Sequence, residues 1–172
     1  MITAIYPGTY DPVTNGHVDV ISRAAKIFDR VVIGVVNNPH HKSPLFTVEE
    51  RVVLLKDALG GVVENVEIDI FSELVVEFAR RWGAKTMVKG LRVISDFEWE
   101  FQMNHLNRLL APDIETMYVM ASPQYSFVSS SGVKEIASFG GDVDELVPPA
   151  VARRFRELYP EARPGAPVSP RE

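Results

Sequence analysis

The chain has 172 residues, with 18 Lys and Arg against 23 Asp and Glu and a formal net charge of −5, and this length is enough for one domain with a hydrophobic core. The acidic balance excludes a general nucleic-acid binder, which needs a basic surface, although a few focused cations can still hold a phosphorylated substrate in a local cleft. Cysteine is absent, which excludes disulfides and thiolate metal sites, and the sequence shows neither an apolar run of membrane-spanning length nor a leader peptide, so we expect a cytoplasmic protein with no membrane partner.

Strand and helix patterns alternate along most of the chain. The first strand pattern covers residues 2–6, a turn covers residues 7–12, and a helical pattern follows in which His17 and Phe28 share one face. The later strand patterns span residues 30–36, 66–71, 86–88 and 115–120. The later helical patterns span residues 47–59, 73–82, 95–110, 129–138 and 149–158.

Sequence signals also mark where individual helices begin and end. Thr47 and Glu50 form a capping box at the start of one helix, and Ser95 and Glu98 form the same pattern before the longest helix. Two glycines directly after residue 59 are expected to stop the first of these helices.

Five strands with interleaved helices predict an α/β fold. We expect one Rossmann-like domain over residues 1–159, with a five-stranded parallel sheet, right-handed crossovers and helices on both faces. Residues 160–172 are rich in proline and lack apolar periodicity, so they are expected to form a disordered tail.

Candidate site residues follow the ends of the predicted strands. Thr9 follows the first strand, Lys42 the second, Lys89 and Arg92 the fourth, and a serine-rich segment, residues 126–131, the fifth. Because the carboxyl ends of parallel strands emerge on one edge of a sheet, these groups are expected to converge there. Each could be an ordinary turn residue when taken alone, but together they suit a polyphosphate.

His17 is expected in the first turn of the helix that follows the first strand. Free backbone N–H groups and the positive end of the helix dipole favour an anion at that place. Gly8 and Gly16 could let the backbone approach a ligand, could adopt a positive φ, or could be plain turn glycines. The chain lacks the Rossmann dinucleotide fingerprint and the Walker P-loop motif, so the phosphate site has to be of another type.

The predicted helix over residues 95–110 carries a polar stripe, formed by Asp96, Glu100 and Asn107, between two apolar stripes. The apolar residues are Trp99, Met103, Leu106 and Leu110 on one side and Phe97 and Phe101 on the other. Such a helix could line a pocket, with one apolar stripe in the core and the other against a second subunit. It could equally be a helix with a few satisfied buried polar groups, and the pattern leaves both interpretations open.

Other residues also have both a functional and a structural interpretation. The serines at 129–131 could bind a ligand or only cap a helix, and residues 125–127 could stack on an adenine ring or only fill the core. His40 and His41 are loop neighbours that are expected to point apart, and no carboxylate is placed to complete a metal site. The serines show no Ser-His-Asp arrangement, which argues against acyl chemistry.

The chain resembles the phosphopantetheine adenylyltransferase family in five segments that occur in order between residue 1 and about residue 158. The matching segments cover residues 6–17, which end on Thr14-Asn15-Gly16-His17, and residues 46–51, 88–92, 96–100 and 125–131. The resemblance implies transfer of AMP from ATP to 4′-phosphopantetheine, giving dephospho-coenzyme A and pyrophosphate. It further implies Mg²⁺ as a cofactor, a homohexamer, and inhibition by coenzyme A.

The resemblance also implies site residues, to which we add roles on physical grounds. The resemblance implies that His17 stabilises the transition state, whereas on physical grounds we expect Lys42 to hold the incoming phosphate and Arg92 to hold the far end of ATP, and we assign no residue as a metal ligand. The ATP-binding positions correspond to Thr9, Tyr10, His17, Gly90, Leu91, Arg92, Glu100, Tyr125, Ser126, Phe127, Val128, Ser129, Ser130 and Ser131. The substrate-binding positions correspond to Thr9, Lys42, Val75 and Lys89, and Asn107 and Glu135 match positions close to that substrate.

The chain departs from the family pattern at three positions. Lys89 stands where many members have arginine, which keeps the charge but loses bidentate geometry toward phosphate. Trp99 replaces a common tyrosine, and Gly132 occupies a position that a larger apolar residue usually fills.

Three other functions remain open at this point. The first is a nucleotidylyltransferase that acts on nicotinamide mononucleotide or uses a cytidylyl donor. The second is a nucleotide-binding regulator without catalysis, which the presence of His17, Lys42 and Arg92 disfavours. The third is a flavodoxin-like redox module.

Overall fold

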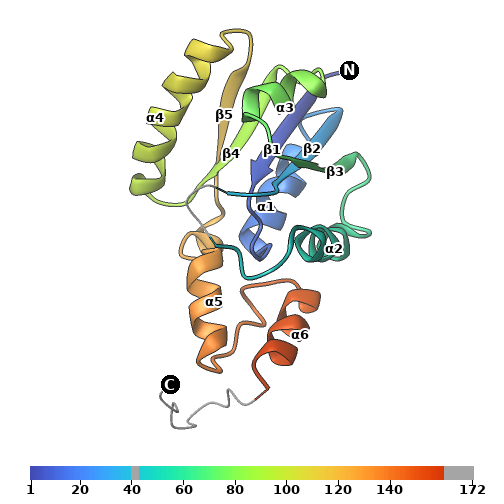
Figure 1. Ribbon diagram of the computed structural model, residues 1–172, viewed down its shortest axis with the longest axis vertical. Helices are drawn as coiled ribbons and strands as arrows, with labels where there is room; N and C mark the ends of the chain where they lie inside the picture. Colours follow the sequence, from blue (N-terminus) through green and yellow to red (C-terminus); the bar gives the residue numbers. More distant parts are fainter. Residues whose placement is uncertain (40–42, 161–172) are drawn as a thin grey trace.

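A five-stranded parallel sheet forms the centre of the structure, a computed structural model that describes residues 1–39 and 43–160 (Figure 1). The strands lie in the order β3-β2-β1-β4-β5, and this arrangement confirms the predicted Rossmann-like sheet. Their bounds are β1 (Thr3–Gly8), β2 (Arg30–Val36), β3 (Val66–Phe71), β4 (Thr86–Leu91) and β5 (Glu115–Met120).

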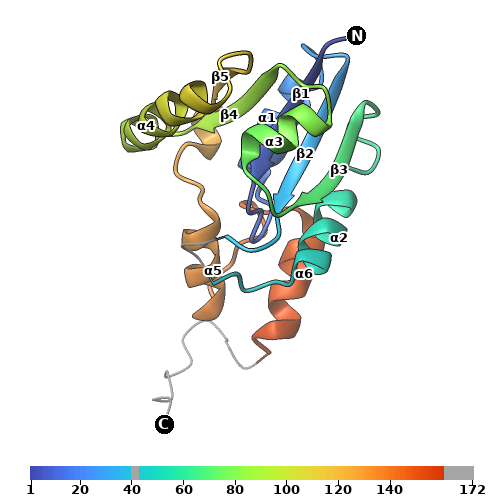
Figure 2. The ribbon, with the colours of Figure 1, turned by 45° about the horizontal axis from the view of Figure 1, so that its top comes forward.

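Helices cover both faces of the sheet, as predicted. They are α1 (Asn15–Ala24), α2 (Val48–Leu59), α3 (Val75–Arg81), α4 (Ile94–Leu110), α5 (Ser130–Ser138) and α6 (Pro149–Leu158), with a short 3₁₀ turn η1 (Pro123–Tyr125) that the sequence did not predict. Both ribbon views show α5 and α6 beyond the carboxyl ends of the strands (Figures 1 and 2).

Alternating side chains along the strands fill two separate cores. Ala4 and Tyr6 of β1 pack with the apolar faces of α1, α2, α5 and α6, whereas Ile5 points to the other face. There it packs with Val32 and with Phe78 of α3. The period of two along the strands therefore accounts for the near-continuous apolar runs in the sequence.

The sheet is open at its centre, between β1 and β4. These strands pair over only two positions, Ala4 with Thr86 and Ile5 with Met87, whereas β4 and β5 pair over their full length. Strand β1 nevertheless continues along β2 as far as Gly8, where the sequence predicted a turn. Pro7 is tolerated there because β1 has already lost its β4 neighbour and behaves like an edge strand on that side.

Helix starts follow the predicted pattern at α2 but not at α4. Thr47 and Glu50 form the predicted capping box. The box predicted at Ser95 is wrong, because α4 begins at Ile94 without a side-chain cap and Ser95 lies inside the helix. The carboxylate of Asp96 instead accepts the backbone N–H of Arg92, which draws the chain into the helix earlier.

Helix α4 lies against the β4–β5 side of the sheet but, throughout its described length, buries none of its side chains (Figure 1). The expectation that one of its apolar stripes enters the core is therefore wrong. Phe97 contacts Tyr118 of β5, with ring centroids 6.4 Å apart, and remains 46% exposed. The helix is nevertheless joined to β5 by the hydroxyl of Tyr118, which donates to the carbonyl oxygen of Glu100 at 3.2 Å.

Two predicted features lie outside the described residues. The first is the predicted loop with Lys42 and the two histidines before it. The second is the tail from residue 161, whose disorder remains a prediction. Among the residues that the structure does describe, no helix combines the length and the apolar character needed to cross a membrane.

Candidate active site

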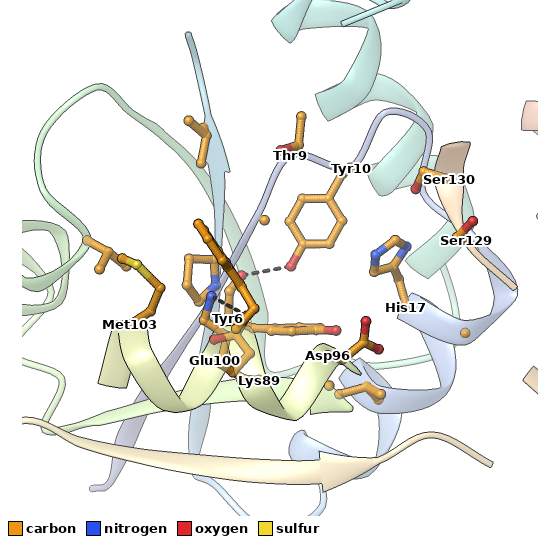
Figure 3. A pocket seen from close by; sticks show the side chains of 18 of the residues that line it. Tyr6, Thr9, Tyr10, His17, Lys89, Asp96, Glu100, Met103, Ser129 and Ser130 are labelled. Carbon is orange, nitrogen blue, oxygen red and sulfur yellow. Dashed lines mark hydrogen bonds and ion pairs between the residues drawn. The ribbon is translucent and has the colours of Figure 1, made fainter. Parts of the chain in front are cut away.

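A cleft of about 930 Å³ opens at the carboxyl ends of β1 and β4, where the two strands separate (Figure 3). Crevices of this kind, at the point where strand order reverses, are where open α/β sheets bind ligands. The predicted site residues that line it are Thr9, Tyr10, His17, Val75, Lys89, Gly90, Arg92, Glu100, Asn107, Val128, Ser129, Ser130 and Ser131. The predicted convergence of distant loops on one edge of the sheet is therefore confirmed for these residues.

Five other predicted site residues do not line the cleft. Leu91 is buried in the sheet, and Glu135 is exposed on α5. In the segment after β5, Tyr125 packs beside the main core, and Phe127 is 72% exposed with Ser126 next to it. A stacking role for this segment would need a ligand that extends beyond the cleft, so these five assignments remain predictions.

The turn after β1 takes its shape from Tyr10. This residue has φ of +52°, a conformation that is costly for a non-glycine residue, and its ring lies back over the strand. Its hydroxyl donates to the Tyr6 carbonyl oxygen at 2.8 Å. A Cβ at position 8 would come within 2.9 Å of the Tyr10 ring, so Gly8 is required for this packing rather than for a positive φ of its own.

His17 is held by the first turn of α1. Its Nδ1 accepts the backbone N–H of Thr14 at 3.1 Å, while the Thr14 hydroxyl caps the helix by accepting the N–H of His17. Because Nδ1 is an acceptor in this capping box, the neutral imidazole carries its proton on Nε2. The ring also packs edge-on against Tyr10, with centroids 5.1 Å apart, so its orientation is fixed from two sides (Figure 3).

Arg92 is oriented by a carboxylate and a carbonyl. Its Nε and Nη2 donate to the two oxygens of Asp96, each at 3.0 Å, and its Nη1 donates to the Val128 carbonyl oxygen at 3.0 Å. Burial by itself would raise the pKa of Asp96, but the hydrogen bonds and charge of Arg92 outweigh it and hold that pKa below its usual range. Asp96 therefore stays ionised and keeps the guanidinium in place at neutral pH.

Lys89 and Glu100 form an ion pair within the cleft, with Nζ and Oε1 3.4 Å apart. Lys89 is on β4 and Glu100 is on the polar stripe of α4, so the pair joins the two walls. The stripe residues Asp96, Glu100 and Asn107 all line the cleft, which supports the pocket interpretation of that helix.

Tyr6 is a cleft residue that the sequence analysis missed, because its place in an apolar strand marked it as core. Its ring lies between β1 and β4, and a Cβ at position 90 would come within 3.1 Å of its hydroxyl, which explains the glycine there. Burial, helped by the negative charge of Glu100, raises the pKa of Tyr6 well above its usual range. The phenol is therefore neutral at any physiological pH.

The cleft has a polar and an apolar end (Figure 3). His17, Ser129 and Ser130 lie at one end in the view, and Met103 lies at the other. The apolar lining, most of which the sequence analysis did not assign to a site, includes Val36, Phe71, Leu74, Val75, Trp99 and Met103, with the polar Ser72 and Glu73 between Phe71 and Leu74. Such a cleft fits an elongated ligand that is anionic at one end and less polar at the other.

Comparisons with known proteins agree with this geometry. The cytidylyltransferase-like family model matches residues 5–136. A phosphopantetheine adenylyltransferase from Heliobacterium modesticaldum is 49% identical, over 98% of this chain and 99% of the relative. One from Alkaliphilus metalliredigens is 51% identical, over 88% of this chain and 95% of the relative.

A solved structure supports the fold independently. It is a crystal structure from Vibrio parahaemolyticus described as a nicotinate-nucleotide adenylyltransferase, with a TM-score of 0.66 over 90% of this chain and 99% of that one. At 18% sequence identity, the likeness supports the fold alone.

Proposed function

The chain belongs to the phosphopantetheine adenylyltransferase family, within the nucleotidylyltransferase superfamily, and we propose that its cleft carries out that family's reaction. AMP is transferred from ATP to 4′-phosphopantetheine, which yields dephospho-coenzyme A and pyrophosphate. The observation that carries the proposal is the joining of His17 and Arg92 with an apolar end in one cleft. The polar end suits a triphosphate, and the apolar end suits an acceptor with a long, weakly polar arm.

The reaction needs no protein nucleophile. An oxygen of the acceptor phosphate attacks the α-phosphorus of ATP, and the bond from that phosphorus to the β-phosphate oxygen breaks. The acceptor phosphate is largely deprotonated at neutral pH, so the protein has to bring two polyanions together and stabilise the charge of the transition state.

His17 is assigned to the α-phosphoryl group. The capping box directs the proton of the neutral imidazole to Nε2, which can donate a hydrogen bond to a developing negative charge. The first turn of α1 adds the positive end of the helix dipole, which favours a bound anion.

The cations of the cleft are assigned to the remaining phosphates. Arg92, together with the start of α5 at Ser129 to Ser131, is assigned to the β- and γ-phosphates, since all of them line the cleft. Lys89 is assigned to the acceptor phosphate, and so is Lys42, which lies outside the described residues. Val75 and Asn107 are assigned to the pantetheine arm, since both line the cleft.

Magnesium is assigned to the bound nucleotide. Within the described residues, no group of three or more His, Asp or Glu side chains could hold a metal ion, and the acidic groups Asp96 and Glu100 already pair with Arg92 and Lys89. The cleft therefore fits Mg²⁺ that enters on ATP and is bound mainly by phosphate oxygens. Such an ion would neutralise part of the charge on the phosphates.

Assembly, regulation and location remain proposals from the family. A homohexamer agrees with the exposed apolar side chains of α4, such as Leu109, which is 81% exposed. Inhibition by coenzyme A agrees with its chemistry, because it is the product dephospho-coenzyme A carrying one more phosphate. A cytoplasmic location remains a prediction.

Product analysis tests the proposal. Purified protein is incubated with Mg²⁺ and ATP together with 4′-phosphopantetheine, nicotinamide mononucleotide or nicotinate mononucleotide, and separately with CTP in place of ATP. We expect dephospho-coenzyme A and one equivalent of pyrophosphate with the first acceptor and ATP only. Turnover of a pyridine nucleotide acceptor instead would contradict the proposal, and so would ATP binding without pyrophosphate release.

A further inference from the structure

Arg51 of α2 is a buried arginine that joins the ends of two strands beneath the cleft. Only 1% of its surface is exposed. Its Nη1 donates to the carbonyl oxygens of Thr9 at 2.7 Å and Val36 at 2.8 Å, and its Nη2 donates to the carbonyl oxygen of Asn37 at 3.1 Å. Thr9 follows β1, and Val36 and Asn37 lie at the end of β2, so one side chain ties two of the loops that build the site.

Stability alone does not explain a cation at this place. Within the described part of the chain the guanidinium forms no ion pair with a carboxylate, and its Nε has no hydrogen-bond acceptor. Burial lowers the pKa of Arg51, although the charges of Asp11 and Glu49 raise it, and an arginine remains protonated in proteins. The guanidinium is therefore held by three carbonyl oxygens, and no carboxylate contact from the described residues offsets the desolvation cost of its charge.

The contact with Thr9 determines which way the next amide faces. In a trans peptide the carbonyl oxygen and the N–H point in opposite directions, so holding the Thr9 oxygen on Arg51 turns the Tyr10 N–H away from the buried layer. Tyr10 is the residue with φ of +52°. No hydrogen bond among residues 1–39 and 43–160 uses its N–H, and both Thr9 and Tyr10 line the cleft.

The contacts with Val36 and Asn37 act on the other wall. Val36 lines the cleft, and the chain runs from Asn37 into the segment that contains Lys42. Arg51 therefore also fixes the end of β2 at the wall of the cleft that Val36 lines.

We propose that Arg51 is a positioning residue for the transfer reaction, which aims the Tyr10 N–H at the nucleotide phosphates and fixes the end of β2 where Val36 lines the cleft. This inference rests on the proposed function. Arg51 contacts neither substrate in this proposal. It affects the reaction by holding the backbone of Thr9, Val36 and Asn37.

The test compares Arg51→Met with Leu55→Ala. Leu55 is a fully buried residue of the same helix that makes none of the three carbonyl contacts, so its truncation destabilises the fold and leaves those hydrogen bonds in place. Both variants are assayed well below their melting temperatures. For Arg51→Met we expect KM to rise at least tenfold for both ATP and 4′-phosphopantetheine and kcat to fall, whereas Leu55→Ala keeps both KM values within twofold of the wild type.

Arg51→Lys provides a second variant in case Arg51→Met does not fold. It keeps the charge but loses the planar fork, so we expect KM values between those of the wild type and the methionine variant. Wild-type KM values in a folded Arg51→Met or Arg51→Lys would overturn the proposal. Equal KM changes in Leu55→Ala would do the same, because they would show a general effect of destabilisation.

A readout without catalysis separates this proposal from the proposed function. ATP affinity is measured by the fluorescence of Trp99, which lines the cleft, in a background where the other tryptophan, Trp82, is replaced by Phe. A wild-type protein that makes no dephospho-coenzyme A would contradict the proposed function only. ATP affinity that is unchanged between the wild type and Arg51→Met in this assay would contradict the role of Arg51.

Discussion

At the scale of single residues, the cleft is organised by partners that fix its chemical groups before any substrate binds. Thr14 fixes the imidazole of His17 through a capping box, and Asp96 fixes the guanidinium of Arg92 through two hydrogen bonds. The sequence predicted His17 and Arg92 as site residues from their place after strands. It did not predict their partners, because a helix-capping histidine is an unusual substitute for Glu or Gln, and because the capping pattern at Ser95 concealed the role of Asp96.

Replacing Asp96 by Asn tests this organisation. The variant keeps the shape but loses the charge that holds Arg92, so the guanidinium can leave its position. We expect kcat/KM for ATP to fall about tenfold, which corresponds to roughly 1.4 kcal/mol and to the loss of one charge-assisted hydrogen bond. Steady-state kinetics of pyrophosphate release, measured at varied ATP concentration, gives the kcat/KM that checks this expectation.

Glu98→Gln is the matched control for this substitution. Glu98 is an exposed carboxylate two residues further along the same helix, and it does not line the cleft. Its replacement should leave kcat/KM unchanged. A normal kcat/KM in Asp96→Asn would show that Arg92 needs no fixed orientation.

At the scale of elements, local sequence signals correctly predicted features that depend on a few neighbouring residues, such as the bounds of several strands and the start of a helix. The strands β2, β3 and β5 and the start of α2 match their predicted bounds, since apolar runs and the Thr47 box act over a few residues. The separation of β1 from β4 could not be predicted, because pairing between strands that are distant in sequence leaves no local pattern. The exposure of α4 could not be predicted either, because periodicity shows which residues share a helix face but not what covers that face.

The capping box of α2 gives a prediction for stability against pH. The backbone hydrogen bond from Thr47, followed by the hydrogen bond from Arg154, lowers the pKa of Glu50. Because the folded pKa is below the unfolded one, the ionised carboxylate stabilises the fold above its unfolded pKa, and this contribution is lost as the pH falls through the folded value. Gln can keep the box but loses the charge that pairs with Arg154 and faces the start of the helix, so we expect Glu50→Gln to cost about 0.5–1 kcal/mol at pH 7.

Thermal unfolding at pH 7 and near pH 3 checks this expectation. The difference between wild type and Glu50→Gln should shrink at the lower pH, as the carboxylate of Glu50 becomes protonated. Glu49→Gln removes the same charge from the same turn but leaves the box and the Arg154 contact in place, so it serves as the control. A difference that persists unchanged at low pH would mean that the ionised form contributes nothing.

At the scale of the whole molecule, α4 combines a wall of the cleft with exposed apolar side chains. It lines the cleft with its polar stripe while Leu106 and Leu109 are 54% and 81% exposed. Contiguous exposed apolar side chains on a helix mark an interaction surface. The sequence analysis suggested that one apolar stripe of this helix could lie against a second subunit. Such a subunit would cover the exposed side chains and hold one wall of the cleft in place.

Light scattering after size exclusion tests the assembly. We expect a hexamer for the wild type and smaller species for Leu106→Glu combined with Leu109→Glu, because two buried carboxylates would oppose the interface. Ile27→Glu, at a residue that is 62% exposed and far from α4 in sequence, should keep the wild-type mass. A monomeric wild-type protein would contradict the proposed assembly.

The cleft unites His17, Arg92 and the apolar end only if the whole chain folds as described, and His17 is the group assigned to the reacting phosphorus. The most direct test is kcat of His17→Ala at saturating MgATP and 4′-phosphopantetheine, with ATP affinity measured in parallel and His105→Ala, on the exposed side of α4, as control. We predict a loss of about 10²–10³-fold in kcat, typical of removing one transition-state donor, with ATP affinity changed less than a few-fold. A kcat near that of the wild type would contradict the assignment of the chemistry to this cleft.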